Sequence, residues 1–383
     1  MTAVINAVPL SMLQIGLIAS PSQTSGSDRY YFELLRALRA QGDQVRGVVL
    51  GDPSAIQNPI GDVESFAPEG SRAWRRWTGL RRVMPQLVRG SNIVVSHMAA
   101  HAFPVLDQIA ARPLVVHFHG PWALEGRADG HGLAKFCLRQ VQERSVYSRG
   151  ARIIALSQAF ADILERHYRV DPSIIRIVPG GVDLARFDTR ESRAQARERL
   201  GWPLDRPVIA TVRRLVPTKG IEQLIEAVAM VRAEVPDLFV GIAGTGPLAG
   251  DLQRLVHERG LDDTVKFAGY ISDEQLPLLY RAADAFVVPT QALEGFGLVV
   301  VEALACGTPA IVTPVGGLPE AVRGLDPSLV LAGSSAEHIA RGIADAMSGR
   351  VPLPSEKACI DYAHSFEWSN IARRVRAIYR EVA

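Results

Sequence analysis

The sequence predicts an α/β protein built from two doubly wound halves, each a parallel sheet covered by helices on both faces. Short apolar runs alternate with amphipathic helical stretches along the chain, which is typical of strands joined by crossover helices. A chain of 383 residues is also too long for one ordinary hydrophobic core, and this favours two domains of roughly 180 residues each. The simplest assembly of two such halves places a cleft between them.

The expected strands are short apolar runs, each followed by a Gly, Pro, Ser or His loop or by a helix. In the first half they fall at residues 13–19, 45–50, 93–96, 114–118 and 152–156. In the second half they fall at residues 208–212, 238–243, 265–268, 285–288 and 310–312. A further strand at 174–178 leads into Pro179-Gly180-Gly181, where Pro and paired Gly suit a joint between the halves, although any turn can use them.

Composition argues against several classes of protein. Apolar residues make up 48% and charged residues 21% of the chain, which is ordinary for a soluble globular protein, and a net charge of +2 gives no basis for nucleic-acid binding. The cysteines Cys137, Cys306 and Cys359 form no CxxC pair, which argues against zinc and a disulfide framework and fits a reducing cytoplasm. No apolar window approaches the length of about 18 residues that spans a membrane, and the N-terminal residues lack the basic start of a secretion signal. We therefore expect a cytoplasmic protein that binds no nucleic acid.

The most informative segment runs from Glu294 to Glu302 and reads EGFGLVVVE. Gly295 and Gly297 allow a sharp turn, and the apolar run that starts at Leu298 predicts a buried helix. Such a helix start offers unpaired backbone N–H groups and a partial positive charge, which suit a phosphate. With one carboxylate before these amides and another about one turn beyond, the segment matches a nucleotide-sugar, whose hexose and ribose hydroxyls flank a diphosphate.

Cations to balance a diphosphate stand upstream, in the loop that follows the predicted strand at 208–212. Arg214 and Lys219 lie in this loop, at the carboxyl end of the strand, where open α/β sheets bind their ligands. Arg offers a fork of donors to phosphate oxygens and Lys a point charge. The alternative is that both are solvated side chains of a surface loop; joined to the acidic pair downstream, the phosphate interpretation is favoured.

Taken in order, these motifs resemble those of the retaining glycosyltransferases of family 4, over most of residues 184–320. That family has the GT-B fold, in which two Rossmann-like doubly wound domains face each other across a cleft. The motifs that carry the resemblance are Arg214 with Lys219, then Gly244-Thr245-Gly246-Pro247, then Glu294 with Glu302.

The resemblance implies that different parts of the chain bind the acceptor and the donor. Residues 1–180 would form an acceptor-binding domain and residues 181–365 a donor-binding domain. Residues 366–383 would form a closing helix that crosses back onto the first domain, as is usual in GT-B proteins.

The resemblance also implies roles for single residues. Arg214 and Lys219 would bind the donor diphosphate, Glu294 the transferred sugar and Glu302 the ribose. The phosphate-binding helix start and its surroundings supply the further donor contacts, and the base would lie beside Tyr270, with the backbone of Ile271 reading its edge. The remaining residues expected at the donor are Gly244, Phe296, Gly297, Leu298 and Val299.

In the first half, a loop from Pro21 to Asp28 follows the first strand and precedes an amphipathic helix. A glycine-containing helix entry suits an anion or a sugar hydroxyl. Gly26 matches the small residue that lies close to donor phosphate and acceptor in the family, although many relatives have two glycines there. The alternative is that Ser25 and Ser27 only cap the helix.

His117 and His119 lie at the end of the strand at 114–118 and point to the same side of it. A zinc site needs further ligands, and no third one with a sensible spacing is near, so no metal is expected. The resemblance assigns the His that precedes Gly120 to the active site. We therefore expect His119 to hydrogen-bond the transferred sugar or the acceptor, and His117 to be a structural histidine.

Residues 71–89 predict a helix with five arginines and no acidic residue between positions 71 and 84. Its apolar face, flanked by arginines, indicates an interfacial helix at anionic lipid headgroups, and a lipid-linked or envelope-glycan acceptor would follow from that. The alternative, that the tryptophans pack inside the first domain, stays open. The apolar face consists of Ala73, Trp74, Trp77, Leu80, Met84 and Leu87.

The expected reaction is transfer of a hexosyl group from a UDP- or GDP-sugar to a hydroxyl, with retention of the anomeric configuration. It would serve the synthesis of a polysaccharide, a glycolipid or another cell-envelope glycan. Because no Asp-X-Asp stands at a strand end, we expect no metal and no cofactor other than the nucleotide-sugar co-substrate.

The main rival is an NAD(P)-dependent oxidoreductase, because Gly244-Thr245-Gly246 opens a G-x-G-x-x-A pattern after a strand. That fingerprint requires an acidic residue about 20 positions on, at the end of the next strand. The strand at 265–268 ends instead in Gly269-Tyr270, and Asp262-Asp263 precede it, so the fingerprint fails. A non-catalytic nucleotide-sugar binding protein of the same fold, or a sugar-nucleotide epimerase, remains open, although the full set of motifs favours transfer.

Overall fold

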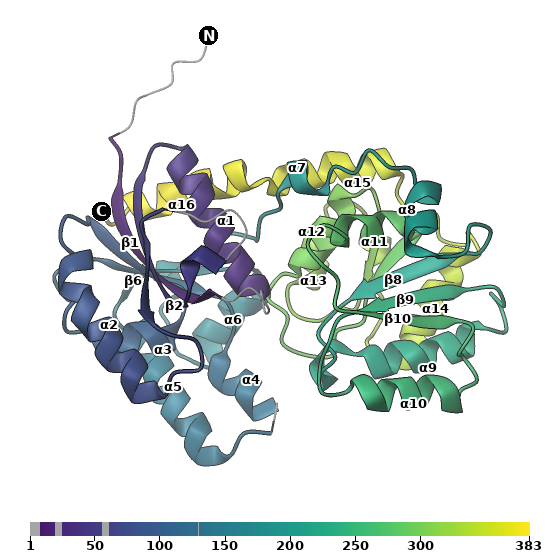
Figure 1. Cartoon of the computed structure of the whole chain (residues 1–383), viewed down its shortest axis with the longest axis horizontal. Helices are drawn as coiled ribbons and strands as arrows, with labels where there is room; N and C mark the ends of the chain where they lie inside the picture. Colours follow the sequence, from purple (N-terminus) through teal and green to yellow (C-terminus); the bar gives the residue numbers. More distant parts are fainter. Residues whose placement is uncertain (1–7, 20–24, 56–60, 129) are drawn as a thin grey trace, which may run out of the picture. The chain divides into compact units, whose positions relative to one another are not determined.

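The computed structural model describes residues 8–19, 25–55, 61–128 and 130–383. The chain divides into two compact units, each an α/β domain with its own parallel sheet (Figure 1). The first unit runs to Gly180 and also includes Trp368–Ala383, and the second unit is Gly181–Glu367. The expectation of two doubly wound α/β halves is confirmed.

The sheet of the first unit has seven parallel strands in the order β3-β2-β1-β4-β5-β6-β7. The strands are β1 (Ser11–Ala19), β2 (Gln44–Gly51), β3 (Val63–Ala67), β4 (Ile93–Ser96), β5 (Leu114–Phe118), β6 (Gly150–Ala155) and β7 (Ile175–Ile177). The helices are α1 (Gly26–Ala40), α2 (Ala73–Leu87), α3 (Ala99–Ala102), α4 (Trp122–Ala128), α5 (Leu133–Tyr147), α6 (Gln158–Arg166) and α16 (Trp368–Arg380).

One strand of this sheet, β3, is absent from the sequence-based expectation. It lies at the edge of the sheet and buries only Phe66 and Ala67, whereas Glu64 and Ser65 are exposed. The central strands are apolar on both faces because helices cover both. An edge strand with a solvated face lacks that continuous apolar run.

The C-terminal helix α16 belongs to the first unit and packs against α1 (Figure 1). Its buried residues recur every three or four positions, the spacing that gives a helix one apolar face. The indole of Trp368 meets the ring of Tyr30 edge to face at 5.1 Å, and Glu381 just beyond the helix pairs with Arg152 at 2.7 Å. The buried face of α16 is Trp368, Ile371, Ala372, Val375, Ile378 and Tyr379.

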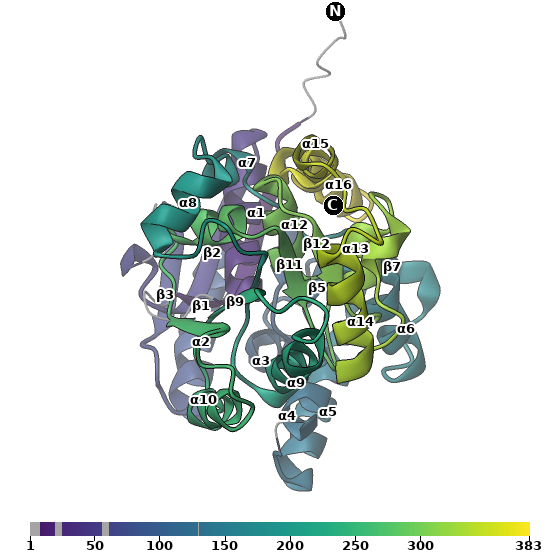
Figure 2. The same cartoon turned by 90° about the vertical axis from the view of Figure 1, so that its right-hand side faces the viewer.

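The second unit has a five-stranded parallel sheet in the order β10-β9-β8-β11-β12. Helices cover both of its faces, with α9, α10 and α14 on one and α8, α11 and α12 on the other (Figures 1 and 2). The strands are β8 (Val208–Val212), β9 (Phe239–Ala243), β10 (Val265–Gly269), β11 (Ala285–Val288) and β12 (Ala310–Val312). The helices are α7 (Leu184–Phe187), α8 (Arg193–Leu200), α9 (Ile221–Val231), α10 (Ala249–Glu258), α11 (Leu276–Ala282), α12 (Leu298–Ala305), α13 (Leu318–Val322), α14 (Ala336–Met347) and α15 (Glu356–Ala363).

The strand order of the second unit reverses between β8 and β11, which are neighbours in the sheet. In open α/β sheets, ligands bind outside the carboxyl ends of the strands at such a reversal. The loops that leave β8 and β11 there are residues 213–220 and 289–297. These are the segments that the sequence singles out for the diphosphate and the sugar.

The two loops are held together by backbone contacts around Gly220. The amide of Gln291 donates to the carbonyl of Thr218 at 2.9 Å. Gly220 has φ +72°, and a Cβ at this position would collide with the carbonyl of Pro289. The chain can therefore pass this closely only with glycine at position 220.

This geometry predicts that Gly220→Ala destabilises the second unit far more than Gly201→Ala. Gly201 has φ +64° in the same unit, but a Cβ there meets nothing within 4 Å. The control thus carries only the backbone cost of a left-handed alanine, about 1–2 kcal/mol, and Gly220→Ala adds the collision. Calorimetric unfolding of the full chain measures both; equal losses in the two variants would contradict the close contact.

Candidate functional site

A cluster of charged side chains joins the loops after β8 and β11. Glu294 Oε2 accepts hydrogen bonds from Lys219 Nζ at 2.9 Å and from Arg213 Nη2. The same Arg213 nitrogen donates to Thr290 Oγ1 at 2.6 Å. Two cations from one loop therefore converge on a single carboxylate oxygen from the other.

The side chains of the cluster are largely buried, and each of them carries a charge. Burial by itself would raise the pKa of Glu294, but Arg213 and Lys219 outweigh it and lower that pKa to about 2. Burial also lowers the pKa of Lys219, and the nearby Glu294 carboxylate opposes this shift. Glu294 is thus a carboxylate at any physiological pH, and it cannot act as an acid.

Arg213 is the member of the cluster that the sequence reasoning missed. It chose Arg214, whose side chain is exposed, whereas Arg213 is 8% exposed. Alternation along an extended backbone offers a signal, since Arg213 falls on the same side as the buried Thr211, two residues before it. Arg214 remains at the mouth of the same loop without a recorded bond to Glu294.

The backbone turns sharply on both sides of Glu294. Leu293 adopts φ +53° and Gly297 φ +82°, whereas Gly295 is not left-handed, so only one of the two predicted glycines needs its special freedom. Behind the turn, the amide of Gly317 donates to the carbonyl of Glu294 at 2.9 Å. A left-handed non-glycine residue is uncommon and often marks a functional site.

The predicted phosphate-binding helix is α12, and it begins at Leu298 as expected. The amide of Val300 bonds to the carbonyl of Gly297 at 2.8 Å. Among the described residues, the amides of Gly297, Leu298 and Val299 have no recorded acceptor, which leaves them available for an anion. The Phe296 ring is buried against Phe366 at 5.4 Å, so only its backbone can face a ligand.

Glu302 lies just over one turn into α12 and is 3% exposed. Its Oε2 accepts a hydrogen bond from the Tyr280 hydroxyl at 2.7 Å. The structure therefore places Glu302 on the expected helix, but it engages one carboxylate oxygen with Tyr280. No bond between Glu302 and the Glu294 cluster is recorded among the described residues.

The Gly244-Thr245-Gly246 turn packs against the backbone of the loop after β8. Arg213 N donates to Ala243 O and Leu215 N to Thr245 O, both at 2.9 Å, and a Cβ on Gly244 would collide with the carbonyl of Arg213. These glycines thus serve the approach of two loops, which explains the G-x-G pattern without a dinucleotide. Ile271 follows β10 in a partly buried loop, next to the exposed Tyr270.

In the first unit, His119 lies directly after β5 and is partly exposed. Its Nε2 lies 3.0 Å from Nδ1 of His97, and burial lowers its pKa to about 3, so the imidazole is neutral. His117 is 2% exposed and bonded at both ring nitrogens, to Tyr30 and Tyr379. The expectation that His117 is structural is confirmed.

The start of α1 is capped by Ser25. The Asp28 amide donates to Ser25 Oγ at 3.2 Å and the Ser25 amide to Asp28 Oδ2 at 3.1 Å, a reciprocal capping box. Capping by Ser25 is therefore correct, whereas Ser27 only bonds to Ser25. Gly26 is the first, exposed residue of the helix, and the part of the predicted loop at 20–24 lies outside the described residues.

Helix α2, at residues 73–87, lies within the predicted range of 71–89, and its apolar face is divided in two. Leu80, Met84 and Leu87 are buried in the first unit. Trp77 is 39% exposed, with its ring 5.8 Å from Phe103, and Trp74 is 62% exposed. The packing interpretation holds for the C-terminal half of the helix, and the N-terminal half presents indole and guanidinium groups to solvent.

Two further observations bear on ligands. Over the described ranges, no group of three or more His, Cys, Asp and Glu could hold a metal ion. The same residues contain no helix with the length and apolarity needed to cross a bilayer.

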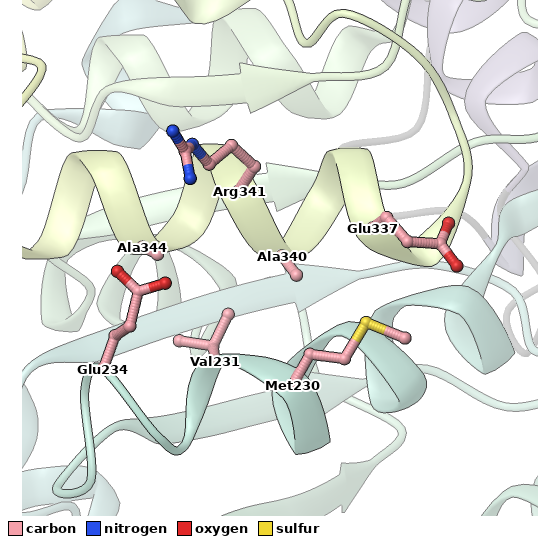
Figure 3. A pocket seen from close by; sticks show the side chains of 7 residues that line it. All are labelled: Met230, Val231, Glu234, Glu337, Ala340, Arg341 and Ala344. Atoms are coloured by element: carbon pink, nitrogen blue, oxygen red, sulfur yellow. The ribbon is translucent and has the colours of Figure 1, made fainter.

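A surface pocket between α9 and α14 lies apart from all of the predicted site residues (Figure 3). Two of its charged groups are engaged in ion pairs, Glu234 with Arg350 at 2.7 Å and Arg341 with Asp345 at 3.4 Å. We assign it no binding role. Its lining consists of Met230, Val231, Glu234, Glu337, Ala340, Arg341 and Ala344.

Related sequences are glycosyltransferases. The D-inositol 3-phosphate glycosyltransferase of Streptomyces scabiei is 35% identical over 251 residues, which are 63% of this chain and 56% of that protein. The enzyme of the same name from Mycolicibacterium smegmatis is 36% identical over 271 residues, 70% of this chain and 62% of that protein. The chain thus spans less than two thirds of the length of these relatives.

Similar solved structures show the fold. Sucrose-phosphate synthase from Thermosynechococcus elongatus superposes with a TM-score of 0.78 at 23% identity, over 97% of this chain and 98% of that one. HepE of Anabaena in complex with UDP gives 0.79 at 19% identity, over 97% and 100%. WaaG, a glycosyltransferase of lipopolysaccharide biosynthesis, gives 0.75 at 18% identity, over 96% and 99%.

Family models cover both units of the chain. Residues 24–186 match the model described as Glycosyltransferase Family 4, and residues 192–366 match the model described as glycosyl transferases group 1. Together with the fold and the motif set, these matches mean that the chain belongs to the family 4 glycosyltransferases of the GT-B fold.

Proposed function

We propose that this protein transfers a hexosyl group from a UDP- or GDP-sugar to a hydroxyl, with retention of the anomeric configuration. The observation that carries the proposal is the meeting of Lys219 and Glu294 immediately before the start of α12. Such a site offers a cation, a carboxylate and unpaired amides to a diphosphate and its attached sugar. HepE, a structural neighbour, was solved with UDP and with UDP-glucose, which favours a uridine donor.

The charge of the site suits a diphosphate. Glu294 neutralises only one of the two cations that it contacts, and Arg214 adds a further positive charge at the mouth of the loop. Arg214, Lys219 and the first amides of α12 bind the diphosphate and stabilise the negative charge that grows on it as the sugar departs. The positive charges of Arg213 and Lys219 thereby offset the repulsion between the diphosphate and the Glu294 carboxylate.

The remaining donor contacts follow the family resemblance. Glu294 binds hydroxyls of the transferred sugar, Glu302 binds the ribose, and the backbone of Ile271 reads the base. Gly244 lies beside the diphosphate loop, Gly26 lies near phosphate and acceptor, and His119 hydrogen-bonds the sugar or the acceptor.

The proposed mechanism needs no protein nucleophile. Glu294 is held by Arg213 and Lys219 and keeps a pKa of about 2, so it serves as a fixed hydrogen-bond acceptor for sugar hydroxyls. The acceptor hydroxyl attacks the anomeric carbon on the face that the diphosphate leaves, and the departing phosphate oxygen takes the proton. No step calls for a metal or another cofactor.

The acceptor is a glycan or a lipid-linked glycan at an anionic membrane surface. Exposed Trp74 and Trp77, together with the arginines of α2, give the first unit an amphipathic surface of the kind that binds lipid headgroups. The sequence relatives carry the name D-inositol 3-phosphate glycosyltransferase, so inositol 3-phosphate is a second acceptor to assay.

The first test is a panel of UDP-, GDP- and ADP-sugars with the wild-type chain and Glu294→Gln. We expect transfer to fall by about 10²-fold or more in the variant, because a preorganised charge at the sugar is lost, while the affinity for the nucleoside diphosphate changes little. Glu258→Gln, at an exposed carboxylate of α10, is the control. Unchanged turnover in Glu294→Gln refutes the role of this residue, and donor binding without transfer or hydrolysis identifies a sensor.

Lys219→Ala should weaken nucleoside-diphosphate binding far more than nucleoside binding. The loss of a charge-assisted hydrogen bond is worth roughly 1.5–3 kcal/mol, or about 10- to 100-fold in Kd. Titration calorimetry with UDP and with uridine separates the two, and Lys266→Ala on the exposed edge of β10 serves as control. An equal loss for both ligands would place Lys219 away from the diphosphate.

Reversing two arginines of α2, Arg75→Glu with Arg76→Glu, should release the protein from anionic vesicles. Each basic residue near such a surface contributes about 1 kcal/mol, so partitioning onto phosphatidylglycerol vesicles should fall at least about tenfold. The matched control reverses Arg112 and Arg149, exposed residues of the same unit outside α2. Unchanged sedimentation with vesicles would favour the alternative that α2 only packs against the protein.

A further inference from the structure

A buried polar network lies beneath His119 in the first unit. It runs without interruption from β5 through β1 to the C-terminal helix, and the Glu294 cluster plays no part in it. Buried polar groups of this number are costly unless each one has a partner, so the pattern of donors and acceptors is constrained. The members of this His119 network are Gln14, Tyr30, His97, His117, His119 and Tyr379.

Gln14 is the branching point of the network. Its side chain is fully buried, with Oε1 2.8 Å from Nε2 of His97 and Nε2 3.4 Å from the hydroxyl of Tyr379. Its Nε2 also lies 3.2 Å from Sδ of Met12. A thioether sulfur carries lone pairs and no hydrogen, so the NH₂ side of the amide must face Met12 and the carbonyl side must face His97.

This orientation of Gln14 fixes the branch that leads to His119. The carbonyl oxygen can only accept, so Nε2 of His97 carries the hydrogen and Nδ1 of His97 is left with a lone pair. Nε2 of His119, which lies 3.0 Å from that lone pair, must then donate. His119 is therefore protonated at Nε2, and its Nδ1 is an acceptor.

The donors and acceptors of the second branch follow from the same orientation of the Gln14 amide. Gln14 donates to the Tyr379 oxygen, so the Tyr379 hydroxyl is free to donate to Nε2 of His117 at 2.7 Å. Nδ1 of His117 then donates to the oxygen of Tyr30 at 3.2 Å. Every bond of both branches has one donor and one acceptor, whereas turning the Gln14 amide over would reverse them all.

The three imidazoles are neutral, which makes the tautomer decisive. Burial lowers the pKa of His97 and of His117 well below the ordinary value, and that of His119 to about 3. A charged imidazole would donate from both ring nitrogens, so it would have no choice between two tautomers. A neutral one presents either a donor or an acceptor to its open side.

We propose that Gln14 is a positioning residue that sets His119 in its Nε2–H form, so that Nδ1 accepts a hydrogen bond from a ligand hydroxyl. His119 is partly exposed, and Nδ1 has no recorded partner among the described residues. The group bound there is a hydrogen-bond donor, such as a sugar or acceptor hydroxyl; a carbonyl, carboxylate or phosphate oxygen is disfavoured. This assignment of the ligand rests on the proposed function, whereas the assignment of the tautomer does not.

The test is a long-range ¹H–¹⁵N correlation spectrum of the full chain labelled with ¹⁵N at histidine, which separates protonated from bare ring nitrogens. His119→Gln identifies the His119 signals among the nine histidines. We expect a protonated Nε2 and a bare Nδ1 at His119 in the wild-type protein. A protonated Nδ1 overturns the proposal without any variant.

Gln14→Leu removes the acceptor that His97 requires. His97 then avoids an unpaired buried N–H by moving its hydrogen to Nδ1, and His119 is driven toward the Nδ1–H form. Tyr379→Phe is the matched control, because it removes one hydroxyl from the other branch and leaves Gln14, His97 and His119 in place. It should alter the His117 signals only; an unchanged His119 tautomer in folded Gln14→Leu would overturn the role of Gln14.

Kinetics distinguish this inference from the proposed function. With one neutral hydrogen bond to the ligand lost, kcat/KM for transfer should fall roughly three- to tenfold in Gln14→Leu, while UDP affinity is unchanged. If the wild-type chain bound no nucleotide-sugar, the proposed function would fail and the tautomer result would still stand. A changed tautomer with unaltered transfer would refute the contact between His119 and the ligand hydroxyl.

Discussion

The second unit of this protein depends on one carboxylate that two cations share. Glu294 holds Arg213 and Lys219 from a neighbouring loop, and each partner would be costly to bury without the others. Ion pairs of this kind add little net stability, but they specify one arrangement of the groups involved. The loops that leave β8 and β11 are thereby fixed at the point where the strand order of the sheet reverses.

The Glu294 cluster and the His119 network hold their polar groups in different ways. In the second unit, full charges are buried in a compensated cluster. In the first unit, the His119 network is uncharged. Its histidines, tyrosines and glutamine are linked by hydrogen bonds in which each donor and each acceptor is fixed. The first arrangement suits a ligand of high negative charge, and the second suits recognition of uncharged hydroxyls.

Much of the fold could be predicted because apolar runs in a doubly wound sheet are continuous. The strands at 93–96, 114–118, 208–212, 285–288 and 310–312 have the predicted bounds. β3 was missed because only Phe66 and Ala67 of its five residues are buried, so it has no continuous apolar run. Lys219, Glu294 and the start of α12 were found because they are close in sequence to glycine and strand signals.

The remaining residues of the sites depend on tertiary structure. Arg213 and Arg214 are adjacent and chemically identical, and only the direction of the backbone after β8 decides which one is buried. Gln14, His97 and Tyr379 come from three distant segments, and no local pattern marks them as partners of His119. Their relation follows from the pairing of β1 with β4 and from the packing of the C-terminal helix on α1.

The left-handed backbone at Leu293 affects the stability of the second unit and the position of the Glu294 carboxylate in opposite directions. A side chain in this conformation costs of order 1 kcal/mol, and glycine at the same position would remove that cost. Glycine would also widen the range of angles open to the peptide that carries Glu294, and so loosen the carboxylate on which both cations converge. A more stable unit and a more rigidly aimed carboxylate are therefore alternatives at this one residue, and the sequence has the rigid one.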